Sequence, residues 1–136
     1  MWHYQNVPFQ PNEEELSQWQ GFVYMITERS TNKKYIGKKF FWSRRRLPPL
    51  KGKTRKRIVV KESDWKTYYG SSEDLKTLVE ERGTENYYRE ILRLCKTKGE
   101  CSYYEAKEQF ERDVLLKDDY YNEFIGCKIH SKHIAK

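Results

Sequence analysis

The segment of residues 21–39 constrains the fold of this chain more than any other stretch. Its first six residues alternate, with Phe22, Tyr24 and Ile26 on one side of an extended segment and Val23 and Met25 on the other. Alternation of aromatic and β-branched residues is typical of a strand. Residues 30–32, Ser-Thr-Asn, favour a turn because their side chains hydrogen-bond the local backbone. The extended pattern resumes at residue 35, so the segment predicts a β-hairpin with Tyr24 and Tyr35 on its two arms.

The composition indicates one folded domain. At 136 residues the chain is long enough for a single core. Aromatic residues make up 15% of the sequence, which is too much for a disordered tail. No apolar run approaches the roughly 18 residues of a membrane span, and residues 1–9 lack the basic and apolar regions of a signal peptide. We therefore expect a cytoplasmic protein with no membrane partner.

Positive charge is concentrated in residues 33–61. This segment holds thirteen Lys or Arg residues and no Asp or Glu. The other 14 basic residues (27 less 13) stand against 20 acidic ones, so the rest of the chain is net −6. An unrelieved basic block repels itself unless a partner neutralises it, which argues against a merely solvated face. The asymmetry predicts a nucleic acid as the partner of this segment.

Two capping patterns mark the starts of helices. Asn12 is followed three positions later by a Glu, which predicts a short helix over 12–19. Ser71 is followed at the same spacing by an Asp and opens a stripe of apolar residues at helical spacing. With Gly83 at the position of a C-cap, this pattern predicts a helix over 72–82.

Two later segments complete the expected fold. Residues 87–94 alternate like a third strand, and residues 100–117 predict a long helix. The apolar line of that helix is expected to contain Tyr103, Ala106, Phe110 and Val114. The order of elements predicts a small α/β (α+β) domain with a three-stranded, mainly antiparallel sheet flanked by helices.

Two short motifs in the hairpin resemble those of a known nuclease family. Gly21-Phe22-Val23-Tyr24 and Tyr35-Ile36-Gly37 are similar to the paired motifs of the GIY-YIG nucleases, which lie on neighbouring strands at this spacing. The first motif departs from the family name, because it reads GFVY where the name gives G-I-Y, but the tyrosine is retained. The resemblance covers about residues 20–125 and implies a small GIY-YIG-like domain with metal-dependent endonuclease activity on DNA.

The resemblance also implies how such a site works. Hydrolysis of a phosphodiester needs an activated water, a counter-charge for the phosphate and help for the leaving oxygen. In this family one Glu holds the metal, an Arg steadies the phosphate and the tyrosines handle the water. Tyr24 and Tyr35 match the tyrosines, with Tyr24 as the candidate that activates the water. A Tyr has an ordinary pKa of about 10, so as a base it needs a nearby cation, and Lys38 or Lys39 would supply it.

The metal is expected to be Mg²⁺ or Mn²⁺, held by one glutamate. Mg²⁺ often takes only one or two protein carboxylates, so a single Glu can suffice. Glu105 is followed by Ala106, which resembles the family's E-A pattern, whereas Glu108 lies nearer the apolar line of the helix. Glu105 is favoured, and Glu108 stays open as the alternative. Asn122 matches the family's late asparagine, which hydrogen-bonds within the site or braces it.

The family places a helix with an inward-pointing arginine after the YIG strand. Here such a helix could last two or three turns before Pro48 and Pro49 stop it. Arg44, Arg45 and Arg46 compete for the role, and only one of them can face the site because helical neighbours point about 100° apart. Arg45, ten positions after Tyr35, is closest to the family spacing and is favoured.

A basic insertion at about 44–61 sets this chain apart from the family. It is interpreted as a loop or ribbon lying along phosphates, or alternatively as a disordered arm that orders on binding. The residues expected to contact nucleic acid are Lys38, Lys39, Arg44, Arg46, Lys53, Arg55, Lys56 and Arg57.

Together these features predict a GIY-YIG-type endonuclease, a hydrolase similar to the small phage-encoded homing enzymes. The domain is expected to span 21–125, between an N-terminal arm (1–20) and a basic C-terminal tail (126–136). Its location would be the host-cell cytoplasm if it is phage-encoded. Specificity would come from the insertion, the termini, a partner protein or an oligomer. The alternative is a non-catalytic protein that binds DNA or RNA through residues 33–61.

Overall fold

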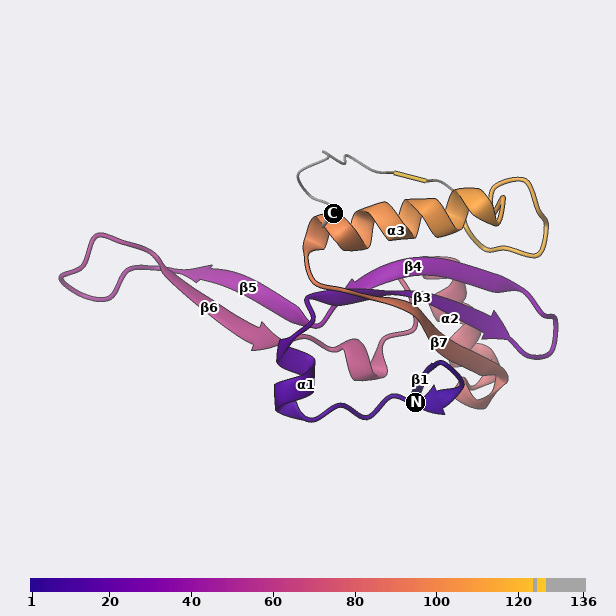
Figure 1. Ribbon diagram of the computed structural model, residues 1–136, viewed down its shortest axis with the longest axis horizontal. Coiled ribbons are helices and arrows are strands. Elements are labelled where there is room, and N and C mark those ends of the chain that lie inside the picture. The colour runs from indigo at the N-terminus through magenta and orange to yellow at the C-terminus, as the bar shows by residue number, and fades with distance from the viewer. Residues whose placement is uncertain (124, 127–136) are drawn as a thin grey trace.

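A five-stranded sheet forms the centre of the computed structural model, which describes residues 1–123 and 125–126 (Figure 1). In the order β2-β1-β7-β3-β4, its strands are β2 (Val7–Pro8), β1 (Trp2–Tyr4), β7 (Tyr87–Cys95), β3 (Gly21–Glu28) and β4 (Lys34–Phe40). Strand β3 is antiparallel to β4 and β7, whereas β1 is parallel to β7. The predicted mixed α/β class with a mainly antiparallel sheet is confirmed. Strands β1 and β2 widen the expected three strands to five, so the residues expected as an N-terminal arm contribute to the sheet.

The hairpin of β3 and β4 has the predicted alternation. Tyr24 pairs with Gly37, and Ile26 pairs with Tyr35. On one face, Phe22, Tyr24 and Ile26 belong to a core cluster shared with the helix that follows residue 72. On the other face, Val23 and Met25 belong to a second cluster shared with Cys101 and Val114. The strand is therefore buried on both faces, and all of its residues except Thr27 are buried.

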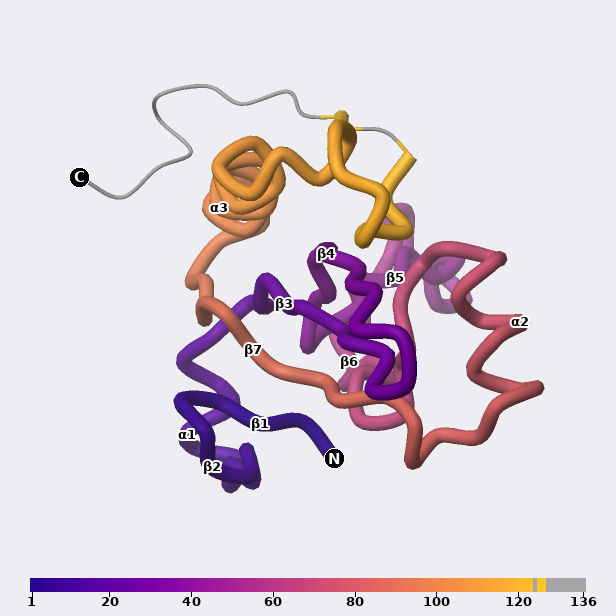
Figure 2. The backbone as a smooth tube through the Cα atoms, turned by 90° about the vertical axis from the view of Figure 1, so that its right-hand side faces the viewer, coloured from indigo at the N-terminus to yellow at the C-terminus, as the bar shows by residue number. Residues whose placement is uncertain are grey.

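Helices cover the two faces of the sheet (Figure 2). They are α1 (Glu13–Ser17), α2 (Glu73–Arg82) and α3 (Lys98–Glu111), with short 3₁₀ turns at Trp65–Thr67 and Thr84–Asn86. The cap at Asn12 is confirmed, because its Oδ1 accepts a 2.8 Å hydrogen bond from the backbone N–H of Glu15. Helix α2 also ends as predicted, with Gly83 as its C-cap.

Two details of the predicted helices are wrong. Ser72, not Ser71, caps α2, and its hydroxyl accepts a bond from the backbone N–H of Leu75. Helix α3 ends at Glu111 rather than at 117, and Phe110 is 62% exposed. The buried line of α3 runs through Cys101, Ala106 and Gln109 instead, because the helix packs its polar Gln109 against the backbone of β4.

The region after the hairpin is a second, separate β-structure and not the predicted helix. Strands β5 (Trp42–Leu47) and β6 (Arg57–Glu62) form a two-stranded antiparallel ribbon that projects from the body (Figure 1). The three adjacent arginines pair with the β-prone residues 58–60, with Arg45 opposite Val59. This pairing between segments far apart in sequence replaces the local helix. Among the described residues, no helix combines the length and apolarity that a membrane crossing requires.

Candidate active site

A cleft of about 470 Å³ lies over the free edge of β4, between the start of α2 and helix α3. Tyr35 lines it from β4, and Ser71 lines it from the segment before α2. Glu105 and Gln109 enter from α3, and Asn122 enters from the segment that follows it. Three of the five predicted catalytic residues, Tyr35, Glu105 and Asn122, therefore line one cleft.

Tyr24 lies under this edge and is fully buried. Its ring is 6.2 Å from that of Tyr35 and 5.9 Å from that of Tyr68, measured between centroids. A Cβ added at Gly37 would lie only 2.4 Å from Tyr24 Oη, so the phenol can lie against the backbone at this position only because residue 37 has no side chain. Among the described residues Tyr24 Oη makes no hydrogen bond of ordinary geometry, although the Tyr68 phenol is close enough to raise its pKa. A buried polar atom in this position calls for an explanation, and a catalytic role is one.

The pKa values of both phenols are raised. Burial is the main cause for Tyr24, and the nearby phenols of Tyr68 and Tyr35 and the Glu105 carboxylate add to it. Burial also raises the pKa of Tyr35, although its hydrogen bond with Ser71 opposes the shift. The causes of the pKa shift at Tyr24 include no neighbouring cation, so help from Lys38 or Lys39 stays a prediction.

Lys38 and Lys39, the two lysines that follow the YIG motif, are held by other partners. Lys38 Nζ donates a 2.6 Å hydrogen bond to Ser102 Oγ. Lys39 Nζ is 2.7 Å from the Asp64 carboxylate and lies 4.2 Å from the centre of the Tyr68 ring. Lys38 nevertheless acts on the site, because its charge opposes the rise in the pKa of Glu105.

Glu105 is half-buried, and the described residues form no ion pair with it. Burial raises its pKa, while the charge and the backbone of Lys38 work against that shift. Glu108 behaves differently: its carboxylate is 3.0 Å from Arg112 Nε, in an ion pair along the helix. Of the two candidate acids, only Glu105 lines the cleft. The described part of the chain holds no group of three or more His, Cys, Asp or Glu residues that could hold a metal ion.

Asn122 braces the edge of β4. Its Oδ1 accepts a 3.0 Å hydrogen bond from the backbone N–H of Ile36, and its Nδ2 donates a 2.8 Å bond to the carbonyl of the same residue. Gln109 Nε2 donates a further 3.0 Å bond to that carbonyl. Two residues back along the strand, the Lys34 carbonyl accepts a bond from the backbone N–H of Tyr121. The edge that carries the YIG motif is thus held by two side-chain amides and by the backbone of the segment before Asn122, not by another strand.

Ser71 was not predicted as a site residue. Its hydroxyl lies 2.8 Å from Tyr35 Oη, and either atom can donate. It is available for this contact because α2 is capped one residue later. The Gly-Ser-Ser run of residues 70–72 resembles a family segment, which is the signal that could have indicated a role beyond capping.

Arg45 does not join the cleft. It lies on the projecting ribbon with Arg44 and Arg46, and all three are exposed. The predicted helix that would have turned one of them inward is absent, because residues 42–47 form β5. The positive charge that affects the pKa of Glu105 is instead that of Lys38. The predicted basic tail lies outside the described residues, apart from Gly126.

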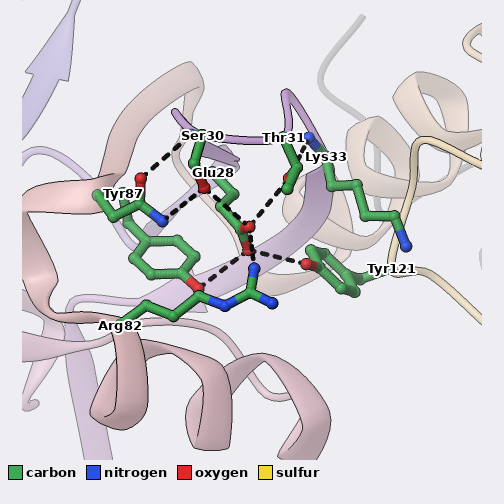
Figure 3. Close-up of polar contacts among 8 residues, drawn as sticks. Glu28, Ser30, Thr31, Lys33, Arg82, Tyr87 and Tyr121 are labelled. Carbon is green, nitrogen blue, oxygen red and sulfur yellow. Dashed lines mark hydrogen bonds and ion pairs between the residues drawn. The ribbon is translucent and has the colours of Figure 1, made fainter.

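A buried carboxylate network lies at the far end of β3 (Figure 3). Glu28 is 1% exposed and accepts hydrogen bonds from Tyr87 Oη at 3.0 Å and Tyr121 Oη at 2.8 Å. The hydroxyl of Thr31 and the guanidinium of Arg82 also donate to it. Through Tyr121, this network fixes the segment that delivers Asn122.

Sequence reasoning missed Glu28, although a signal was present. Glu28 continues the buried alternation of Phe22, Tyr24 and Ile26, so a carboxylate falls where an apolar residue was expected. Burial alone would raise its pKa, but the bonds from Tyr121, Thr31 and Tyr87 and the charge of Arg82 lower it overall. The carboxylate is therefore charged in the folded protein.

The paired tyrosine strands and the glutamate on the covering helix are the features of a GIY-YIG nuclease domain. The model of one family, described as "Putative endonuclease segE, GIY-YIG domain", matches residues 2–125. The chain therefore belongs to the GIY-YIG nuclease family. Neither a curated protein nor a solved structure matches it.

Proposed function

We propose that this protein is a metal-dependent endonuclease that hydrolyses phosphodiester bonds in DNA, of the homing type. The observation that carries the proposal is the meeting of Tyr35 and Glu105 in one cleft, with Tyr24 directly beneath. Family membership over residues 2–125 supports nuclease activity in general. The cytoplasm, of the host cell if the protein is phage-encoded, is the proposed location.

In this proposal Glu105 holds the metal. The carboxylate suits a divalent cation, because it is half-buried without an ion pair among the described residues, and Lys38, whose charge acts on it, bonds to Ser102. Glu73 and Asp74 from the start of α2 line the same cleft and add negative charge to it. Bound there, Mg²⁺ or Mn²⁺ would stabilise the charge that builds up on the phosphate during hydrolysis.

The tyrosines are proposed to handle the attacking water. With pKa values above their ordinary level, both phenols are neutral near pH 7. Tyr24 Oη, without a hydrogen bond of ordinary geometry among the described residues, is the candidate that activates the water. A neutral phenol can take the water's proton only as it gives up its own, so the proton released by Tyr24 would pass by way of Tyr35, which is bonded to Ser71, to the leaving oxygen of the DNA. Lys38 takes the place proposed for Arg45 as the cation near the phosphate, while Arg45 would contact DNA away from the cleft.

The test is cleavage of supercoiled plasmid in Mg²⁺ by the wild type, Glu105→Gln and the matched variant Glu108→Gln. The wild type is expected to nick or linearise the plasmid. Loss of the metal-binding charge should slow Glu105→Gln by about 10²- to 10³-fold, because that charge stabilises the transition state. Glu108→Gln should stay within a few-fold of the wild type, since only its bond to Arg112 is lost.

A thermal melt separates metal binding from turnover. Mg²⁺ should raise the melting temperature of the wild type and of Glu108→Gln, but not of Glu105→Gln, because only a ligand that binds the folded state stabilises it. A wild type that shifts plasmid on a gel and leaves it intact would establish the alternative, a protein that binds nucleic acid without cutting it. If only Glu108→Gln is inactive, the assignment of Glu105 is wrong.

A further inference from the structure

The β5–β6 ribbon exposes an unusual mixture of side chains. All six residues of β6 are exposed, as are residues 43–46 of β5. The cross-strand pairs give both faces the same character, with Arg44 opposite Val60 on one face and Arg45 opposite Val59 on the other. Ile58 and Val60 remain 53% and 55% exposed. Exposed β-branched residues set among arginines call for a partner that is both anionic and apolar.

The ribbon is fixed at its root. Phe41, just before β5, is fully buried, with its ring 4.9 Å from Phe22 and 5.0 Å from Trp65 between centroids. The backbone N–H of Ser63, just after β6, donates a 2.7 Å bond to the Phe41 carbonyl. Trp42 Nε1 donates a 2.9 Å bond to the Trp19 carbonyl. The direction in which the ribbon leaves the body is therefore set by the core.

A basic groove joins the ribbon to the neighbourhood of the cleft. This groove, of about 360 Å³, lies beside the root of β5, and its charged lining residues are Lys38, Lys39, Arg44 and Lys98. Lys38 is also the residue whose charge acts on Glu105. A phosphate backbone that follows the groove away from the cleft would meet cations until it reaches the ribbon.

We propose that the ribbon enters the major groove of duplex DNA and there recognises the target beside the cleft; the inference rests on the proposed function for the choice of DNA. A major groove about 12 Å wide admits a two-stranded ribbon, whereas a minor groove about 6 Å wide does not. Arginines suit guanine edges and phosphates, and Ile and Val side chains suit the methyl group of thymine. The major groove of A-form RNA is too deep and narrow for side chains to read, so duplex RNA is excluded as the ribbon's ligand.

The test measures binding in a Glu105→Gln background, so that bound DNA stays uncut. Arg45→Gln/Arg57→Gln removes two charges from one face of the ribbon, because Arg57 pairs with Leu47 and so shares the face of Arg45. Lys107→Gln/Lys117→Gln removes the same charge from exposed positions on and after α3. Affinities are measured for one short sequence as duplex DNA, single-stranded DNA and duplex RNA over a range of salt concentrations.

The ribbon variant should lose about 30-fold in affinity for duplex DNA near 0.15 M salt. With one of its two arginines on a phosphate and the other on a guanine edge, its log–log salt slope should fall by about 0.9. The control should stay close to the parent. Methylation of guanine N7, which faces the major groove, should weaken binding by the parent and have little effect on the ribbon variant.

Three results would overturn the proposal. They are unchanged binding by the ribbon variant, insensitivity to N7 methylation, and equal affinity for duplex RNA. A sedimentation experiment in which the ribbon variant turns a dimer into a monomer at unchanged DNA affinity would make the ribbon an interface between copies. Cleavage by the Glu105→Gln parent would count against the proposed catalytic site and leave the groove result standing.

Discussion

The cleft and the ribbon are each built on a pair of antiparallel strands, but they treat their side chains in opposite ways. In the hairpin of β3 and β4, Tyr24 and Ile36 are fully buried, and even the free edge at Ile36 is bonded by Asn122 and Gln109. In the ribbon of β5 and β6, the cross-strand pairs are exposed on both faces. An isolated two-stranded ribbon is marginally stable in water. The hairpin is therefore complete within the folded chain, whereas the ribbon is suited to completion by a ligand.

The largest expected effects are on cleavage, and they come from substitutions at the two tyrosines of the hairpin. Tyr35→Phe should lower plasmid cleavage by about 10²-fold, because it removes a proton-handling group and the bond to Ser71. Tyr24→Phe should lower cleavage by a similar factor. Its free energy of unfolding should be unchanged or higher, because the deleted hydroxyl has no partner among the described residues. Cleavage rates are compared with denaturant unfolding of the same samples.

The decisive result is whether Tyr24→Phe loses cleavage activity while its free energy of unfolding stays the same or rises. Full cleavage activity in that variant would show that Tyr24 is a core residue only. Tyr35 would then be the only tyrosine of the pair that acts on the attacking water. Ser71→Ala serves as the control for Tyr35→Phe, because it removes the same hydrogen bond and leaves the phenol in place.

The next effect tests how tightly the hairpin is packed. In Gly37→Ala the new methyl group would lie 2.4 Å from Tyr24 Oη and 2.7 Å from its Cζ. Such overpacking should cost about 1–3 kcal/mol in the free energy of unfolding. The double variant Gly37→Ala/Tyr24→Phe should recover part of that loss, since the closest atom is gone, and the coupling is read from a double-mutant cycle. Additive effects in the cycle would mean that the strands separate instead of clashing.

A smaller effect follows from the buried Glu28. Its folded pKa is lowered, so the stability that it contributes is present above its unfolded pKa, about 4.3. That contribution is lost as the pH falls through the folded value. Acid unfolding should accordingly be steeper in the wild type than in Glu28→Gln. Near pH 7 Glu28→Gln should cost about 1–2 kcal/mol, because the donors around it lose a charged acceptor.

Chemical denaturation at several pH values checks this prediction. The profile of Glu28→Gln should be flatter below about pH 4.5 than that of the wild type. Parallel profiles would mean that other carboxylates account for the acid sensitivity. Because Tyr121 joins Glu28 to the segment that carries Asn122, cleavage by Glu28→Gln should also fall at neutral pH.

The hairpin could be predicted because its information is local. Alternation over residues 21–26, turn residues and the two tyrosine motifs lie within one short segment, and pairing then follows. The class of the fold, the cap at Asn12 and the third strand could be predicted on the same grounds.

The failures have a common physical cause in contacts between distant segments. The helix expected at Arg44–Arg46 is a ribbon because Ile58, Val59 and Val60 pair with it across a long loop. Gln109 is buried by a bond to Ile36, which no helical wheel of α3 could reveal. Within the site, the motifs pointed to Tyr24, Tyr35 and Glu105, whereas the contact between Ser71 and Tyr35 depends on where α2 begins.

The smallest expected effect comes from the same substitution, Ile to Val, made once in the hairpin and once in the ribbon. The two variants are compared by their free energies of unfolding. Ile36→Val in the hairpin removes a buried methyl group and should cost about 0.5–1.5 kcal/mol. Ile58→Val in the ribbon removes the same group from a side chain that is 53% exposed, so the free energy of unfolding should change by less than about 0.5 kcal/mol. Both variants are unfolded by denaturant without DNA. Equal losses would mean that Ile58 is covered in the free protein, as it would be by a second copy of the chain, and the ribbon would then not be free to meet a ligand.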